Sequence, residues 1–150
     1  MEKKILAVLA CLSLAFTAFA DNERVIPFEQ MPQKAQTFTR QYFPAEKNEY
    51  RQAYVTYDPE FLDSSYTVVF TTGDGIEFTK DGEWKDFECR MCTVPAEIIP
   101  APIQAYLTQN FPDVAVKKID RDKREIEVKL ANGFELKFNT AGVLLEVDND

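Results

Sequence analysis

Hydrophobic residues recur along this chain with two different spacings, and the spacing changes at similar places in the first and second halves. Near Glu29 and again near Glu97, an acidic residue opens a segment whose apolar residues lie three or four positions apart, which is typical of a helix with one buried face. These apolar positions are Met31, Ala35, Phe38 and Tyr42 in the first segment, and Ile99, Ile103, Tyr106, Leu107 and Phe111 in the second. Pro44 and Pro112 end the two predicted helices, because proline cannot continue a helix.

After each helix the hydrophobic spacing changes to two. Residues 66–71 and 126–131 alternate between apolar and polar, which predicts strands with one face toward solvent. The same alternation, punctuated by glycine-containing turns, predicts further strands at residues 50–57, 76–78 and 84–87 in the first half, and at 115–120, 134–138 and 143–147 in the second. Each helix is therefore followed by about four antiparallel strands.

The two halves also repeat short sequence motifs. Ile26-Pro27 and Phe43-Pro44 recur 68 residues later as Val94-Pro95 and Phe111-Pro112, whereas Gly82 recurs as Gly142 at an offset of 60. The pattern predicts a duplicated module. The change in offset places eight extra residues in the first copy between Pro44 and Tyr66, and the stretch 57–63 is the main candidate for this insertion.

These features predict an α+β fold of two tandem helix-plus-four-strand antiparallel repeats that share one sheet, with the helices on one face. The first repeat is expected to span residues 21–92 and the second residues 93–150. A module of roughly 60 residues buries little surface alone, so we expect the two to form one compact unit around a common core.

The first twenty residues have the character of a signal peptide. Lys3 and Lys4 precede an apolar run over residues 5–19, and Ala18-Phe19-Ala20 places small residues where a signal peptidase reads them. Cleavage is expected after Ala20. The run is too short for a bilayer-spanning helix, which needs about 20 apolar residues. The sequence therefore predicts a periplasmic or secreted protein that does not insert in the membrane once the signal is removed.

The composition narrows the chemistry. The 150 residues include no histidine, which excludes every mechanism that relies on an imidazole base or ligand. Lys and Arg number 17 against 25 Asp and Glu, and the formal charge of −8 argues against a nucleic-acid partner. We therefore expect a protein that is not an enzyme, without catalytic residues or a cofactor.

Several of these motifs resemble one family. Val94-Pro95-Ala96-Glu97-Ile98, the helix end at Phe111-Pro112, and the run Glu-Val-x-Leu-x-Asn-Gly-x-Glu-Leu-x-Phe-x-x-x-Gly over residues 127–142 are similar to the PepSY-like family of small secreted bacterial proteins. The resemblance implies a fold like that of the beta-lactamase inhibitor protein. It also implies a sheet face that binds a partner and regulates an enzyme of the cell envelope. Fold alone does not establish function.

Cys89 and Cys92 form the sharpest local motif, a C-x-x-C pair. In an exported protein such a pair forms a local disulfide, or cycles as a redox dithiol whose thiolate Arg90 would favour. A zinc site would need two further ligands, and without histidine only carboxylates remain. The disulfide that fastens the junction between the modules is the favoured interpretation, and we predict no metal site.

Aromatic residues distinguish the two halves. Tyr54 and Trp84 lie in the first half, and Leu144 takes the place of Trp84 in the second. Large aromatic side chains often dominate interfaces, although Trp84 could equally fill the core. Phe61 and Leu62 form an apolar tip on the predicted insertion, and exposed loops are common contact sites. The predicted partner-binding residues are therefore Tyr54, Phe61, Leu62 and Trp84.

Together these observations favour a non-enzymatic binding module that contacts a protein or peptide of the cell envelope. Two alternatives remain open: a thiol redox or metal-handling protein that uses Cys89 and Cys92, and a binder of small ligands or cell-wall fragments.

Overall fold

A computed structural model describes residues 22–60 and 62–149. The described chain contains two α-helices, α2 (Gln33–Tyr42) and α3 (Ala101–Asn110), and three short 3-10 turns, η1 (Phe28–Gln30), η2 (Asn48–Tyr50) and η3 (Ala96–Ile98). Its nine strands are β1 (Arg24–Ile26), β2 (Gln52–Asp58), β3 (Ser65–Phe70), β4 (Gly75–Thr79), β5 (Trp84–Glu88), β6 (Val116–Arg121), β7 (Glu125–Leu130), β8 (Phe134–Asn139) and β9 (Leu144–Asn149). The predicted signal peptide lies outside the described residues.

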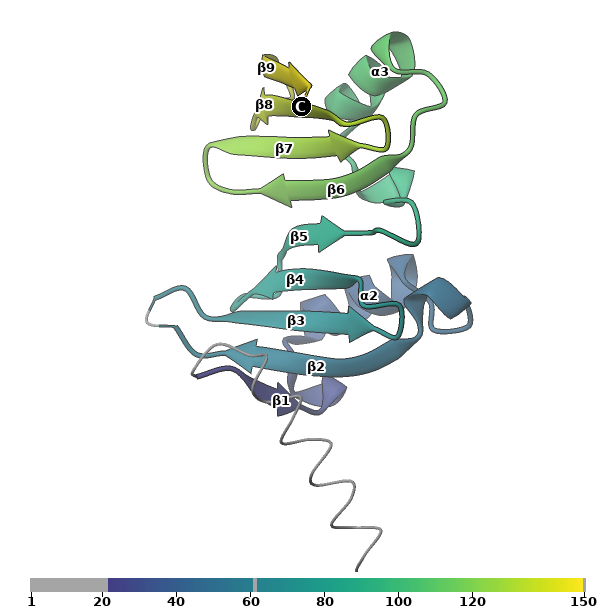
Figure 1. Cartoon of the computed structure of the whole chain (residues 1–150). Coiled ribbons are helices and arrows are strands. Elements are labelled where there is room, and N and C mark those ends of the chain that lie inside the picture. Colours follow the sequence, from purple (N-terminus) through teal and green to yellow (C-terminus); the bar gives the residue numbers. More distant parts are fainter. Residues whose placement is uncertain (1–21, 61, 150) are drawn as a thin grey trace, which may run out of the picture.

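All nine strands form one antiparallel sheet, and the strands are neighbours in the order in which they occur in the sequence. Both helices lie on the same face of this sheet, behind it in Figure 1. The predicted α+β architecture with helices on one face is confirmed. The short edge strand β1 was not predicted, because three residues are too few for an alternating pattern to be recognised. Among the described residues, none of the helices is long and apolar enough to cross a bilayer.

The helices begin later than their sequence pattern indicates. Glu29 and Glu97 lie in η1 and η3, and the α-helices start after Pro32 and Pro100, which have φ angles of −52° and −53°. Proline lacks an N–H group, so it is tolerated at a helix start, where that group would have no partner within the helix. The predicted starts at the two glutamates were therefore wrong by about one turn.

Turn glycines hold the strands close to the helices. Gly82 and Gly142, in the β4–β5 and β8–β9 turns, have φ angles of +85° and +83°, which L-residues rarely adopt. A Cβ atom at Gly82 would lie 3.0 Å from Pro32 Cβ, and one at Gly142 would lie 2.6 Å from Pro102 Cβ. Each turn therefore packs directly against the start of a helix, and a side chain at either glycine would push the two apart.

The buried apolar residues of both halves form a single hydrophobic cluster between the helices and the sheet. In the first half the cluster is aromatic: the ring centroid of Phe43 lies 4.6 Å from that of Phe87 and 5.1 Å from that of Tyr50. In the second half aliphatic side chains such as Ile103 and Leu136 occupy most of the core.

The extra residues of the first half are divided among three places. Relative to the second half, the first has four more residues between its proline-terminated helix and the next strand, one more in that strand, and three more in the β2–β3 turn. The expected insertion at residues 57–63 therefore accounts for only part of the difference. The remainder includes the η2 turn, which places Tyr50 against the aromatic core.

Candidate functional site

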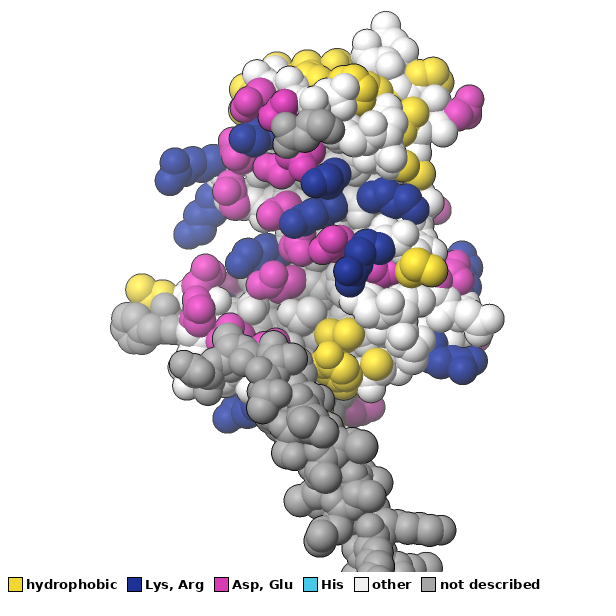
Figure 2. Space-filling view, in the orientation of Figure 1, with side chains coloured by type: hydrophobic (Ala, Val, Ile, Leu, Met, Phe, Trp, Pro, Cys, Tyr) yellow, Lys and Arg dark blue, Asp and Glu magenta, His cyan; other side chains and the backbone are white. Residues whose placement is uncertain are grey.

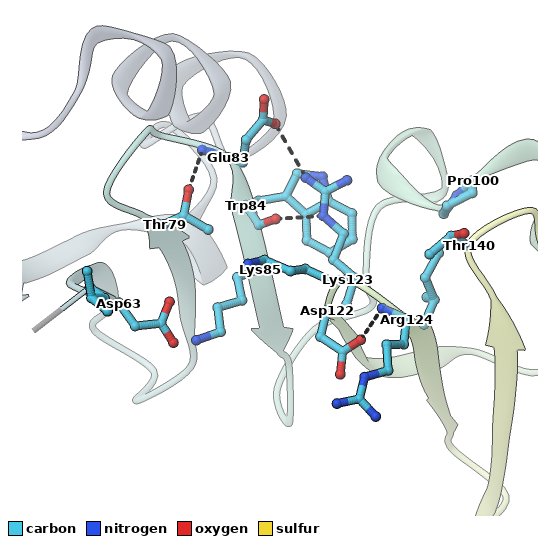
Figure 3. A pocket seen from close by; sticks show the side chains of 13 residues that line it. Asp63, Thr79, Glu83, Trp84, Lys85, Pro100, Asp122, Lys123, Arg124 and Thr140 are labelled. Carbon is cyan, nitrogen blue, oxygen red and sulfur yellow. Dashed lines mark hydrogen bonds and ion pairs between the residues drawn. The ribbon is translucent and has the colours of Figure 1, made fainter. Parts of the chain in front are cut away.

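A cleft of about 900 Å³ lies between the two halves of the molecule. We call it the Trp84 cleft. Its walls come from the β2–β3 turn, the end of β4 and the β4–β5 turn, β5, the segment before α3, the β6–β7 hairpin and the β8–β9 turn. The lining residues include Leu62, Asp63, Glu83, Trp84, Lys85, Arg121, Asp122, Lys123 and Arg124. Figure 3 shows their side chains converging from both halves.

Trp84 and Arg121 form the centre of this cleft. The guanidinium carbon of Arg121 lies 3.8 Å from the centroid of the Trp84 ring, within the range of a strong cation–π contact. Arg121 Nε also donates a hydrogen bond to the backbone carbonyl of Trp84 over 2.6 Å, and its Nη2 lies 3.5 Å from Glu83 Oε2. Burial lowers the pKa of Arg121, and the nearby Glu83 carboxylate partly opposes this effect. The stacked pair therefore joins the end of β6 to the start of β5 and fixes the floor of the cleft.

Charged groups surround this floor. Lys85 points toward Asp63 across the opening (Figure 3). Burial alone would lower the pKa of Lys85, but the Glu77 and Asp63 carboxylates outweigh it and raise that pKa. Lys123 and Arg124 are exposed in the β6–β7 turn, so the rim is rich in cations although the chain as a whole is acidic.

Asp122 shapes the turn that carries these two cations. Its carboxylate Oδ1 accepts hydrogen bonds from the backbone N–H groups of Arg124 over 2.6 Å and Glu125 over 2.9 Å. Those N–H groups lower the pKa of Asp122, because they stabilise its ionised form. The Asp122 carboxylate therefore stabilises the turn, in which the side chains of Lys123 and Arg124 are exposed.

The structure separates the four predicted partner-binding residues. Leu62 lines the cleft, is 76% exposed and has a φ angle of +74°, which is uncommon for leucine. Trp84 is only 7% exposed, so most of its ring fills the core, as the packing alternative expected. Tyr54 lies in β2, 37% exposed and outside the lining of the cleft. Phe61 falls outside the described residues.

Sequence reasoning missed Arg121. Its stacking partner lies 37 residues earlier in the chain, and no local pattern connects the two. A weak signal was available: Arg121 directly follows the predicted strand 115–120 and stands beside the charged run Asp122-Lys123-Arg124. Such runs are usually solvated turns, so composition alone gave no reason to place this arginine against a tryptophan.

The Cys89–Cys92 pair forms a second cluster, on the junction between β5 and η3. The two residues are joined by a disulfide, with Cα atoms 5.2 Å apart. Asp74, whose side chain is fully buried, accepts hydrogen bonds from the backbone N–H groups of Arg90 over 2.8 Å and Met91 over 3.1 Å. The buried carboxylate thus holds the four-residue loop that the disulfide closes. In the sequence, Gly73-Asp74-Gly75 indicates only a turn.

This cluster also has the composition of a metal site. One carboxylate oxygen of Asp74 and the sulfurs of Cys89 and Cys92 all lie within 4.8 Å of one another. With the sulfurs bonded to each other, neither is available as the thiolate that binds zinc. The Asp74 carboxylate already accepts two backbone N–H hydrogen bonds from the loop.

Charged residues gather in the middle of the face of the sheet opposite the helices, which we call the open face. Residues alternate across the strands: Ile76, Phe87 and Ile119 are buried against the helices, so Glu77, Asp86 and Asp120 lie on the open face. Figure 2 shows acidic and basic side chains mixed across the middle of this face.

Asp86 is the most perturbed carboxyl on the open face. It stands directly opposite Asp120 in the β5–β6 pairing, and Lys118 Nζ lies 3.8 Å from its Oδ1. Burial raises the pKa of Asp86 from its usual 3.8 to about 6; Lys118 lowers it, and the Asp120 carboxylate raises it further. Asp86 and Asp120 therefore repel each other across the β5–β6 pairing, which is the seam between the two halves.

Comparison with known proteins identifies the family whose sequence pattern this chain shares. A model of the family described as "Putative beta-lactamase-inhibitor-like, PepSY-like" matches residues 64–146. No curated protein matches the chain.

Solved structures match over nearly the whole described chain. A putative periplasmic protein of the DUF2874 family from Bacteroides vulgatus is 40% identical, with a TM-score of 0.80, and the match covers 87% of this chain and all of the other. A putative calcium-regulated periplasmic protein from Bacteroides thetaiotaomicron is 44% identical, with the same TM-score and coverage. A third protein, from Bacteroides vulgatus and described as a putative periplasmic protein of unknown function, is 26% identical with a TM-score of 0.75; the match covers 85% of this chain and 99% of the other.

Proposed function

Because the chain belongs to the PepSY-like, beta-lactamase-inhibitor-like family, we propose that it is a non-enzymatic binding module of the cell envelope that docks a protein in the Trp84 cleft. The observation that carries the proposal is the gathering of an exposed apolar tip, a stacked Trp–Arg pair and a cationic rim in one opening. Large apolar side chains surrounded by charged groups are typical of energetically important interface positions.

The chemistry of the cleft indicates which partner it would accept. Leu62 offers apolar contact above the largely buried Trp84, while the exposed Lys123 and Arg124 offer positive charge on the rim. A partner surface with an apolar side chain next to carboxylates would complement both. Where that partner is an enzyme of the envelope, docking would act as inhibition or regulation, as the family description implies.

Capture from an envelope extract tests this proposal. A double variant, Lys123→Glu with Arg124→Glu, reverses the rim charge at two exposed positions without touching the core. The matched control is Lys80→Glu, an exposed lysine of the β4–β5 turn outside the cleft lining. We expect wild type and the control to retain the same partner, identified by mass spectrometry, and the rim variant to lose it. Retention of that partner by all three proteins would rule out the cleft as its docking site.

We also propose that the two halves descend from one duplicated module, with residues 21–92 and 93–150 as the two copies. Matching backbone geometry supports this: the helix-ending residues Phe43 and Phe111 have φ angles of −129° and −133°, at the expected 68-residue offset.

We further propose that residues 1–20 are a signal peptide, which is cleaved after Ala20 when the protein is exported to the periplasm. Intact-mass measurement of the protein recovered from the periplasm would test the cleavage site.

Calcium regulation is a second candidate function. The relative at 44% identity is described as calcium-regulated, and hard cations bind clusters of carboxylate oxygens. On the open face, Asp86 and Asp120 face one another with Glu77 and Glu88 nearby, and a divalent cation would relieve their repulsion. Thermal unfolding with calcium or with a chelator tests this: a stabilisation by calcium that Asp120→Asn abolishes would support it, and identical melting curves would exclude it.

The thiol and small-ligand alternatives are less favoured. The Cys89 and Cys92 sulfurs are bonded to each other and Cys89 is fully buried, so a thiol of another molecule has little access to the Cys89 sulfur. The Trp84 cleft is open and strongly charged, whereas small-ligand sites are usually enclosed and apolar.

A further inference from the structure

The sheet ends in two unequal edges. Strand β1, at one end, has three residues, whereas β9, at the other, has six. Within the described residues, β9 pairs only with β8, so the backbone groups on its outer side have no strand partner. An unpaired strand of this length is a template to which another extended chain can hydrogen-bond.

Strand β9 is paired with its neighbour in the same way as β5. Trp84 opposes Phe78 in β4, and Leu144 opposes Phe138 in β8; each pairing is followed by one extra residue. Further along, Phe87 opposes Ile76 as Val147 opposes Leu136. Strands β5 and β9 therefore present equivalent outer edges.

The difference is that the outer edge of β5 is occupied. Strand β6 pairs with it, placing Ile119 opposite Phe87 and Lys118 opposite Glu88. As a result Phe87 is fully buried, whereas Val147, at the equivalent position of β9, is 43% exposed. Strand β6 is thus an example, within this molecule, of a segment that pairs with an edge like that of β9.

The side chains of the β9 edge are apolar and acidic. Val143, Leu145 and Val147 are 58%, 57% and 43% exposed. Hydrophobic side chains gather at the end of the molecule where β9 lies (Figure 2). Natural edge strands are usually protected by lysine or proline, and residues 138–150 contain neither lysine, arginine nor proline. Glu146 and Asp148 add negative charge to the strand.

We propose that the outer edge of β9 is a second docking surface, which binds an extended segment of a partner protein with alternating apolar and basic residues. The apolar residue faces Val147 as Ile119 faces Phe87, and a lysine or arginine faces Asp148 as Lys118 faces Glu88. A second copy of this chain is a poorer occupant, since antiparallel β9–β9 pairing would bring Glu146 and Asp148 of the two copies together. The cleft reaches Thr140 in the β8–β9 turn, but none of the described β9 residues lines it, so this surface extends the proposed binding function without depending on the cleft.

A peptide copied from β6 tests the proposal directly. The probe is an end-blocked peptide with the sequence of residues 115–122, Ala-Val-Lys-Lys-Ile-Asp-Arg-Asp. It is titrated into the purified protein and followed by two-dimensional NMR and amide hydrogen exchange. We expect shifts confined to residues of β8 and β9 and slower exchange of β9 amides. A peptide with both lysines replaced by glutamate is the matched probe, and we expect it to leave the spectrum unchanged.

Protein variants locate the surface independently. Leu145→Lys and Val147→Lys each place a lysine on the edge, and we expect each to weaken peptide binding at least about tenfold. Met91→Lys is the control, because Met91 is 72% exposed and lies away from β9. Circular dichroism verifies that all three variants fold. If Val147→Lys does not fold, Leu145→Lys alone tests the edge. Absence of binding, shifts outside β8 and β9, equal binding of the glutamate peptide, or self-association of the free protein through β9 would each overturn the proposal. Because the rim variant of the Trp84 cleft leaves β9 intact, failure of one surface does not imply failure of the other.

Discussion

The two halves of the sheet have the same strand pattern but different side chains inside it. In the first half Phe43 is fully buried among Tyr50, Phe70 and Phe87. Its counterpart Phe111 is half-buried and contacts Phe134 at 5.1 Å between ring centroids. Turn glycines, prolines and alternating polarity are therefore enough to specify the backbone, while the core composition is free to differ.

The contrast between the two halves is sharpest at the equivalent turns that lead into β4 and β8. Asp74 follows Gly73, and Phe134 follows Gly133, and the two glycines have φ angles of +89° and +95°. One half thus buries a carboxylate where the other packs an aromatic ring. The carboxylate has a use only in the first half, because the Cys89–Cys92 loop supplies N–H groups for it.

The largest expected difference between the halves concerns their helix-ending phenylalanines. Phe43→Ala would leave a cavity in the aromatic cluster and should lower the free energy of unfolding by about 3–5 kcal/mol. Phe111→Ala should cost less, about 1–2 kcal/mol, because its ring is already partly exposed. Urea unfolding followed by circular dichroism measures both. Equal losses would mean that the two cores contribute alike despite their different packing.

Asp74 should give the next largest effect. Asp74→Ala removes a charged acceptor from two backbone N–H groups, and we expect a loss of about 2–3 kcal/mol in the free energy of unfolding. Asp74→Asn is the control that keeps one carbonyl acceptor, so it should retain part of the stability. If alanine and asparagine are equivalent to wild type in urea unfolding, the carboxylate does not hold the loop.

Reduction of the Cys89–Cys92 disulfide should have a smaller effect. The bond closes a loop of only four residues, and short loops restrict the unfolded chain least, so we expect a loss of roughly 2 kcal/mol. Faster hydrogen exchange should be confined to the loop and the Asp74 turn, leaving the second half unchanged. Faster exchange throughout the second half would show that the disulfide supports both halves.

The smallest effect concerns pH and the seam between the halves. The raised pKa of Asp86 means that the folded protein binds this proton more tightly than the unfolded chain does. Its contribution to stability is therefore greatest at low pH and declines as pH rises from about 4 to about 6. After allowance for solvent screening, we expect a decline of about 1 kcal/mol. Comparison of unfolding curves for wild type and Asp86→Asn isolates this contribution, and an identical pH dependence in both would contradict it.

Much of the fold could be predicted because it depends on local patterns. Alternation gave eight of the nine described strands, and the Phe-Pro pairs gave the ends of both helices. The helix starts were misplaced because acidic residues and apolar spacing are shared by a 3-10 turn and the helix that follows it. Strand β1 has too few residues to carry a pattern.

The candidate site was less predictable because its contacts join distant segments. Leu62 was found because an apolar tip on a turn is a local signal, and the structure places it in the Trp84 cleft. Arg121 and Asp74 were missed because their roles come from groups brought near by folding: the Trp84 ring for one, and the backbone of Arg90 and Met91 for the other. The exposure of the β9 edge likewise follows from sheet order, which no local pattern specifies.

The sheet order also has a consequence for how the chain reaches this structure. In the described chain, each strand from β2 to β9 pairs with the strand that precedes it in the sequence, and only the β1–β2 and β5–β6 connections contain a helix. Pairings between sequence neighbours give a low contact order, which favours rapid folding. A chain synthesised from its N-terminus can therefore extend the sheet one strand at a time, each new strand finding its partner already in place.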